Sequence, residues 1–143
     1  MNTDAAVIEA SLVKLAERGI ELRHGLYERF FAAYPARRAD FLCPEATWVR
    51  MTDETLQMIH GLASDESWVW PLVAELSYTH RAYGRLPFEE YETFVDLTVT
   101  TMADALGVDW GEAAAAAWGR QAERLKAMIA KAQTDWERVL PRG

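Results

Sequence analysis

The sequence predicts an all-α fold of about six to eight helices, in one domain that spans residues 1–143. Apolar residues recur at helical spacing along nearly the whole chain, and no stretch alternates convincingly at the strand period. Prolines and glycines fall between these repeats, where helices begin and end. With 143 residues, 50% of them hydrophobic, the chain is long enough to bury one sizeable core.

Gly19 and Pro35 separate the first predicted elements. Thr3 is placed to cap a first helix. The inward face of this helix carries Ile8, Leu12 and Leu15. A second helix follows Gly19, and its apolar face carries Leu22, Leu26, Phe30 and Tyr34. Pro35 then stops this helix or opens a short one.

Pro44 and Pro71 open two further predicted helices, over residues 44–63 and 71–80. Proline is tolerated in a first turn because the N–H groups there have no partner within the helix. The face of the first of these helices carries Trp48, Met51, Thr55, Met58 or Ile59, and Leu62. The inward face of the second carries Leu72, Val73, Leu76 and His80.

Pro87 opens the next predicted helix, over residues 87–106, and Gly107 closes it. Asp109 and Glu112 make a capping-box pattern for a long last helix. The apolar stripe of that helix is Trp118, Ala122, Leu125, Ile129, Ala132 and Trp136. The chain therefore reads as helices joined by short connections.

Charge and composition exclude several classes of function. A formal net charge of −7 argues against nucleic acid or an anionic membrane as the main partner, since both select faces rich in Lys and Arg. No apolar run approaches the roughly 20 residues of a membrane helix, and the N-terminus does not resemble a signal peptide. The single cysteine, Cys43, rules out an intramolecular disulfide. We expect a cytoplasmic protein.

Motifs of several common chemistries are missing from the sequence. It contains no G-x-S-x-G elbow, no Walker-type glycine loop and no H-E-x-x-H zinc helix. Six tryptophans and five phenylalanines are many for this length. They either fill the core or line a pocket for a flat apolar ligand.

The three histidines differ in their surroundings. His24 lies beside charged residues and is expected to be exposed, and His60 falls to one side of an apolar stripe. His80 continues the inward stripe of its helix. Taken by itself, His80 is more often a histidine satisfied in the core or at the surface than a ligand.

Three segments change this interpretation: "LYERFFAAYPARRADF" (26–41), "WPLVAELSYTHRAYG" (70–84) and "AAWGRQAERLKAMI" (116–129). In this order and separation the chain resembles the bacterial single-domain haemoglobins and the globin domain of flavohaemoglobins. The resemblance covers essentially the whole chain. It implies a globin fold that encloses haem b (iron protoporphyrin IX).

The resemblance also implies roles for individual residues. His80 would be the proximal ligand of the haem iron, Phe41 would pack against the macrocycle, and Tyr27 would donate a hydrogen bond on the distal side. Iron needs a strong neutral nitrogen ligand on a rigid element. The other ring nitrogen then needs an acceptor, such as the backbone carbonyl of Leu76. Plausible apolar neighbours of the macrocycle are Phe30, Phe41, Leu76, Leu86, Phe94 and Trp118.

The distal side departs from the family pattern. Met51 stands where the family commonly has a glutamine or histidine, and Thr55 where a leucine is frequent. A shift of one residue would place Thr52 and Leu56 there instead. With Met51 in place, Tyr27 is the main distal donor and Thr55 a second one. The Met51 thioether is an alternative sixth ligand of the iron.

The proximal side departs as well. Flavohaemoglobins have a tyrosine near the position of Tyr91 and a glutamate on the last helix, which polarise the proximal histidine. In this chain, Lys131 and Gln133 occupy the positions near which that glutamate is expected. This departure weakens the case for a peroxidase-like activity.

The function we expect is reversible binding of dioxygen and other diatomic gases (NO, CO) by a cytoplasmic b-type haem protein. The chain ends at Gly143, so we expect no flavin- or NADH-binding domain. The alternative, a nitric oxide dioxygenase, would therefore depend on a separate reductase. A third hypothesis is a haem-free globin-like sensor or interaction module. A homodimer stays open.

Overall fold

A computed structural model describes residues 3–41, 44–84 and 86–140. These residues form helices and connections without any strand, which confirms the predicted all-α class. In chain order the elements are α1 (Thr3–Glu17), α2 (Arg23–Ala33), η1 (Pro35–Asp40), α3 (Pro44–Ala63), α4 (Val69–Thr79), η2 (His80–Tyr83), α5 (Phe88–Leu106), η3 (Gly107–Asp109) and α6 (Glu112–Val139), where η denotes a 3₁₀ helix. Across the described ranges, no helix is long and apolar enough to cross a membrane.

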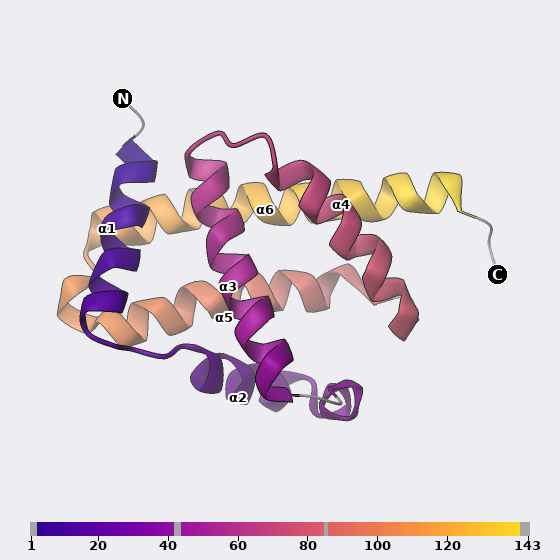
Figure 1. Ribbon diagram of the computed structural model, residues 1–143, viewed down its shortest axis with the longest axis horizontal. Coiled ribbons are helices and arrows are strands. Elements are labelled where there is room, and N and C mark those ends of the chain that lie inside the picture. Colours follow the sequence, from indigo (N-terminus) through magenta and orange to yellow (C-terminus); the bar gives the residue numbers. More distant parts are fainter. Residues whose placement is uncertain (1–2, 42–43, 85, 141–143) are drawn as a thin grey trace.

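Helices α5 and α6 lie side by side, and the other helices are arranged around them (Figure 1). Helix α6 also packs against α1, α3 and α4, while α2 packs against α3 and α5. Helix α3 crosses over the pair, with α1 towards one end of α6 and α4 towards the other (Figure 1). Helix α3, which carries Met51 and Thr55, and helix α4, which leads directly into His80, therefore both pack against α6.

The larger hydrophobic cluster is called here the aliphatic core. It gathers buried side chains from α1, α3, α4, α5 and α6. Its fully buried members include Ile8, Ile59, Val69, Val73, Met102, Leu106, Trp118 and Leu125. Burying such side chains stabilises the fold by about 1.5–3 kcal/mol each.

A polar cluster of Asp4, Arg120 and Gln121 lies at the edge of the aliphatic core, between α1 and α6. The Asp4 carboxylate accepts hydrogen bonds from Arg120 at 2.7 and 3.0 Å and from the Gln121 amide at 2.9 Å. These bonds lower the pKa of the Asp4 carboxyl from its ordinary 3.8 to about 2, and the bond from Arg120 is the largest cause. Burial acts in the opposite direction. The first turn of α1 is thus held to α6.

The second cluster is called here the aromatic cluster. Its buried members are Leu26, Tyr27, Phe30, Phe31 and Phe94, and Tyr34, Phe41, Trp48, Met51 and Leu97 pack against them. The Tyr27 ring lies at its centre, stacked on Trp48 with the ring centroids 5.0 Å apart and the planes 11° apart. Phe41 meets Tyr27 edge-on at 5.4 Å. The cluster joins α2 to the start of α3 and to α5.

Helices α3 and α4 approach closely at Gly61. A Cβ atom at this position would lie 2.7 Å from the Trp68 ring and from a Val69 methyl group. Contacts that short do not occur between real side chains, so the approach requires a glycine. The close contact fixes where α4 begins relative to α3.

Two predicted helix starts differ from the structure. Helix α4 begins at Val69 and takes Pro71 into its first turn, where a proline nitrogen has no bond to lose. The predicted capping box is wrong, because Gly111 precedes α6 and no side chain caps it. Asp109 instead accepts a hydrogen bond from Arg18 at 3.2 Å.

Candidate functional site

A cavity of about 440 Å³ opens between α3, α4, α5 and η1, a size that suits an organic ligand. Nine of the eleven predicted site residues line it: Phe30, Phe41, Met51, Thr55, Leu76, His80, Leu86, Tyr91 and Phe94. The other two, Tyr27 and Trp118, do not appear in its walls. The walls are mainly apolar and aromatic, with charged groups among the residues that line the cavity.

His80 lies where α4 tightens into η2, and its half-buried ring forms part of the cavity wall. Its Nδ1 lies 2.6 Å from the backbone oxygen of Leu76, one turn earlier. A carbonyl oxygen only accepts, so Nδ1 carries the proton of the neutral ring and Nε2 carries the lone pair. The expected acceptor is therefore in place, and Nε2 is the atom that could bind a metal.

Local sequence explains this geometry. The backbone oxygen of Leu76 also accepts from the His80 N–H and from the Thr79 hydroxyl, the latter at 3.1 Å. Several donors thus converge on one carbonyl in the last turn of α4. Gly84 then ends η2 with φ of +90°, a conformation that favours glycine.

The Tyr91 ring packs against the imidazole of His80. The two ring centroids lie 5.6 Å apart with the planes at 63°. Burial raises the pKa of the Tyr91 phenol to about 12, and the negative charge of Glu90 contributes to this rise as a smaller cause. The phenol therefore keeps its proton near neutral pH. The ring of His80 is held between a backbone acceptor and an aromatic neighbour.

The opposite wall comes from α3. Met51 and Thr55 line the cavity one turn apart, whereas the buried Thr52 and Leu56 do not. This placement agrees with the register predicted first. The Thr55 hydroxyl donates to the Met51 backbone oxygen at 2.7 Å. Its single proton is therefore engaged within the helix, and Thr55 is not a second distal donor in this arrangement.

Tyr27 lies behind the cavity wall. The residue is fully buried, and its hydroxyl donates to the Met51 sulfur at 3.3 Å. Burial raises the pKa of the Tyr27 phenol well above its usual value, so the hydroxyl stays a donor. The structure therefore puts Tyr27 on the expected side, but with its hydroxyl directed to a side chain of the wall.

Trp118 lies in the aliphatic core, away from the cavity. It is fully buried and contacts Trp110, with the ring centroids 5.9 Å apart. The residues of α6 that do line the cavity are Leu125 and Ile129, two and three turns further along. Sequence reasoning put all three on one stripe and chose the one nearest the N-terminus, because periodicity does not say where a long helix crosses a site.

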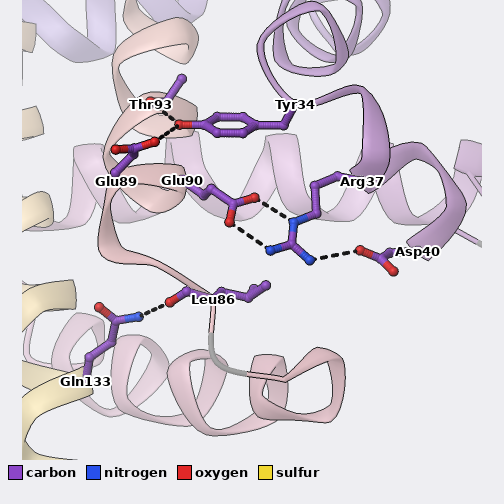
Figure 2. Close-up of polar contacts among 8 residues, drawn as sticks. All are labelled: Tyr34, Arg37, Asp40, Leu86, Glu89, Glu90, Thr93 and Gln133. Carbon is purple, nitrogen blue, oxygen red and sulfur yellow. Dashed lines mark hydrogen bonds and ion pairs between the residues drawn. The ribbon is translucent and has the colours of Figure 1, made fainter.

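Charged side chains among the lining residues were missed by sequence reasoning. Arg37 donates from Nε and an NH₂ group to the two carboxylate oxygens of Glu90, at 2.6 and 2.8 Å (Figure 2). It also reaches Asp40 at 3.4 Å. Nearby, the Tyr34 hydroxyl contacts Glu89 and Thr93 at 3.2 Å (Figure 2). These bonds hold η1 against the first turns of α5.

The two α6 residues predicted near the proximal histidine make other contacts. Gln133 donates to the backbone oxygen of Leu86 at 3.1 Å (Figure 2). Lys131 pairs with Asp135 at 2.6 Å and lies over the Trp70 ring. A hollow of about 40 Å³ beside His80 is lined in part by Glu137, which sequence reasoning did not single out.

His24 is exposed, as predicted, and His60, to one side of its helix's apolar stripe, is half-buried. In the part of the chain that the structure describes, no group of three or more His, Cys, Asp or Glu side chains could hold a metal ion. That finding concerns sites built from several protein ligands, whereas His80 was predicted as a single axial ligand. Cys43 lies outside the described residues.

No protein-family model matches the chain, and no curated protein matches it. The function is therefore inferred from the cavity and from the residues that line it.

Proposed function

We propose that the chain is a globin-type, cytoplasmic haem b protein that reversibly binds dioxygen and other diatomic gases. The observation that carries this proposal is the imidazole of His80. Its Nδ1 is committed to the Leu76 carbonyl at 2.6 Å, and its ring lines a largely apolar cavity. A neutral histidine with one nitrogen fixed by an acceptor is the usual form of a metal-binding imidazole.

The other walls suit a flat apolar ligand. Aromatic and aliphatic side chains from α2, α3, α4, α5 and α6 and from the connections between them surround the cavity, and these include Phe30, Phe41, Leu76, Leu86 and Phe94. Such walls bury an apolar face and keep water away from it. The exposed Arg50 also lines the cavity and supplies a positive charge that suits the carboxylates of a porphyrin. When bound, haem iron supplies the coordination position at which a diatomic gas binds.

Gas binding is preferred here to nitric oxide dioxygenation. Both functions drew on Tyr27 as a donor, and its hydroxyl is directed to Met51. Sustained dioxygenation would in addition need electrons from a separate reductase. The haem-free alternative drew on Met51 as a departure from the family pattern. Met51 lines the same cavity as His80 and Phe41, two residues that a haem-free module has no reason to keep. A cytoplasmic location is part of this proposal and agrees with a chain that has one cysteine.

The proposal is tested by adding haemin to the purified protein and recording ferric, ferrous and carbon-monoxide-bound spectra. We expect wild-type protein to bind haemin and to show a ferrous spectrum that carbon monoxide changes. His80→Ala removes the axial nitrogen and should abolish the wild-type ferrous spectrum. His24→Ala, an exposed histidine outside the cavity, is the matched control and should leave the spectrum unchanged.

Two results would contradict the proposal at different points. A wild-type ferrous spectrum in His80→Ala would show that another residue binds the iron. Failure of the wild-type protein to bind haemin would favour the haem-free interaction module instead.

A further inference from the structure

The Met51 side chain separates the cavity from the buried hydroxyl of Tyr27. Met51 is half-buried and lines the cavity, whereas Tyr27 is fully buried and does not. The Tyr27 oxygen lies 3.3 Å from the Met51 sulfur. A thioether sulfur is a weak acceptor, so this bond holds the phenolic proton less strongly than an oxygen acceptor would.

The Tyr27 ring has little freedom to choose another partner. It is stacked on Trp48 and contacts Phe31, Phe41 and Phe94, with ring centroids 5.0 to 5.6 Å apart. Close packing of this kind keeps a side chain in one rotamer. The hydroxyl therefore stays beside Met51, and its single proton goes either to the sulfur or to a group that takes the place of the sulfur.

The other possible side-chain donors of α3 that line the cavity are Thr47, Arg50 and Thr55, of which Arg50 is exposed. The Thr55 hydroxyl is engaged with the Met51 backbone oxygen at 2.7 Å. Phe30, Phe41 and Phe94, which line the cavity nearby, carry no polar atom in their side chains. A polar gas molecule beside Met51 would thus gain a hydrogen bond from Tyr27 only by taking its proton from the Met51 sulfur.

We propose that Met51 is a specificity-determining residue, whose thioether competes with the gas ligand for the Tyr27 hydroxyl. This inference rests on the proposed haem function. Dioxygen accepts a hydrogen bond in the bound state far better than carbon monoxide does. Competition by the sulfur therefore lowers the preference of the site for dioxygen over carbon monoxide, relative to a site with a free phenol.

The contact itself can be tested without haem. Protein labelled with ¹³C at the methionine methyl groups reports the surroundings of each sulfur by NMR. Tyr27→Phe removes the donor and should shift the Met51 methyl signal. The signal of Met128, a half-buried methionine outside the cavity, should stay in place. An unmoved Met51 signal would overturn the contact and with it the proposal.

Selectivity is tested in the haem-loaded protein by the ratio of the dissociation constants for carbon monoxide and dioxygen. Met51→Leu removes the sulfur at nearly constant volume. We expect this variant to raise the preference for dioxygen about tenfold, the effect of one hydrogen bond of about 1.4 kcal/mol. Tyr27→Phe combined with Met51→Leu should lose that gain, and Met128→Leu should match the wild type.

The outcomes separate this proposal from the haem function. If wild-type protein binds no haemin, both are overturned. If it binds haemin and Met51→Leu leaves the ratio unchanged, only the role of Met51 is overturned. A rise in Met51→Ala but not in Met51→Leu would also overturn that role, because the side chain would then act through its bulk.

Discussion

The aliphatic core draws its buried side chains from α1, α3, α4, α5 and α6, whereas the aromatic cluster joins α2 to the start of α3 and to α5. Most fully buried members of the aliphatic core lie away from the cavity, and an ion pair closes the edge of the core. Phe30, Phe41, Met51 and Phe94 of the aromatic cluster form part of the cavity wall. The aliphatic core thus mainly stabilises the fold, whereas the aromatic cluster also shapes part of the cavity. Substitutions should separate these two effects.

Trp118→Ala should give the largest loss of stability, because it empties the centre of the aliphatic core. The indole is fully buried, and removing a side chain of this size costs about 3–5 kcal/mol of unfolding free energy. Urea denaturation of the haem-free protein measures this loss. Trp118 does not line the cavity, so the folded variant should keep the wild-type ferrous haem spectrum. A changed spectrum would show that Trp118 contributes to the proposed haem site.

Asp4→Asn should have the next largest effect, a loss of about 2 kcal/mol, because it weakens charge-assisted bonds between α1 and α6. Folding lowers the pKa of Asp4 from 3.8 to about 2, so the stabilisation is complete above the unfolded-state pKa of 3.8. It is lost as the pH falls through the folded-state pKa of about 2. Denaturant unfolding at pH 7 and near pH 2 should show the variant and wild type converging at acid pH. Glu9→Gln, on an exposed part of α1, is the control.

Glu90→Gln should have the smallest effect on global stability, about 1 kcal/mol, because it weakens one ion pair beside the aromatic cluster. The loss should be local. Hydrogen exchange of the backbone amides of residues 36–40 should become faster, while exchange in α6 stays slow. Glu92→Gln on the exposed face of α5 should change neither. Equal acceleration in α6 would show that the two regions are not separable.

Contacts within one helix were the part of the site that sequence could predict. His80 and its acceptor Leu76 are four residues apart, and so are Met51 and Thr55, so helical periodicity was enough to place each pair. The bounds of α3 were also predicted correctly, because Pro44 and the loop after Ala63 mark both ends.

Contacts between distant segments were not predictable in this way. The Tyr27 hydroxyl meets Met51 across 24 residues, and Arg37 meets Glu90 across 53. Both bonds depend on how α2 and η1 pack against α3 and α5, which no local pattern specifies. The capping box failed for the same reason. The carboxylate of Asp109 has a partner 91 residues away, and this partner outweighs the local motif.

Gly61 contributes no side chain to the cavity, yet its contact bears on where His80 lies. It touches Val69, the first residue of α4, and His80 directly follows the last. The two ends are about 16 Å apart along a helix, which behaves over this length as a stiff rod. In mechanical terms α4 is a lever clamped at Gly61, and a small tilt at the clamp becomes a displacement of the imidazole at the far end. The absence of a methyl group in α3 thus helps to set the position of a nitrogen atom in the cavity.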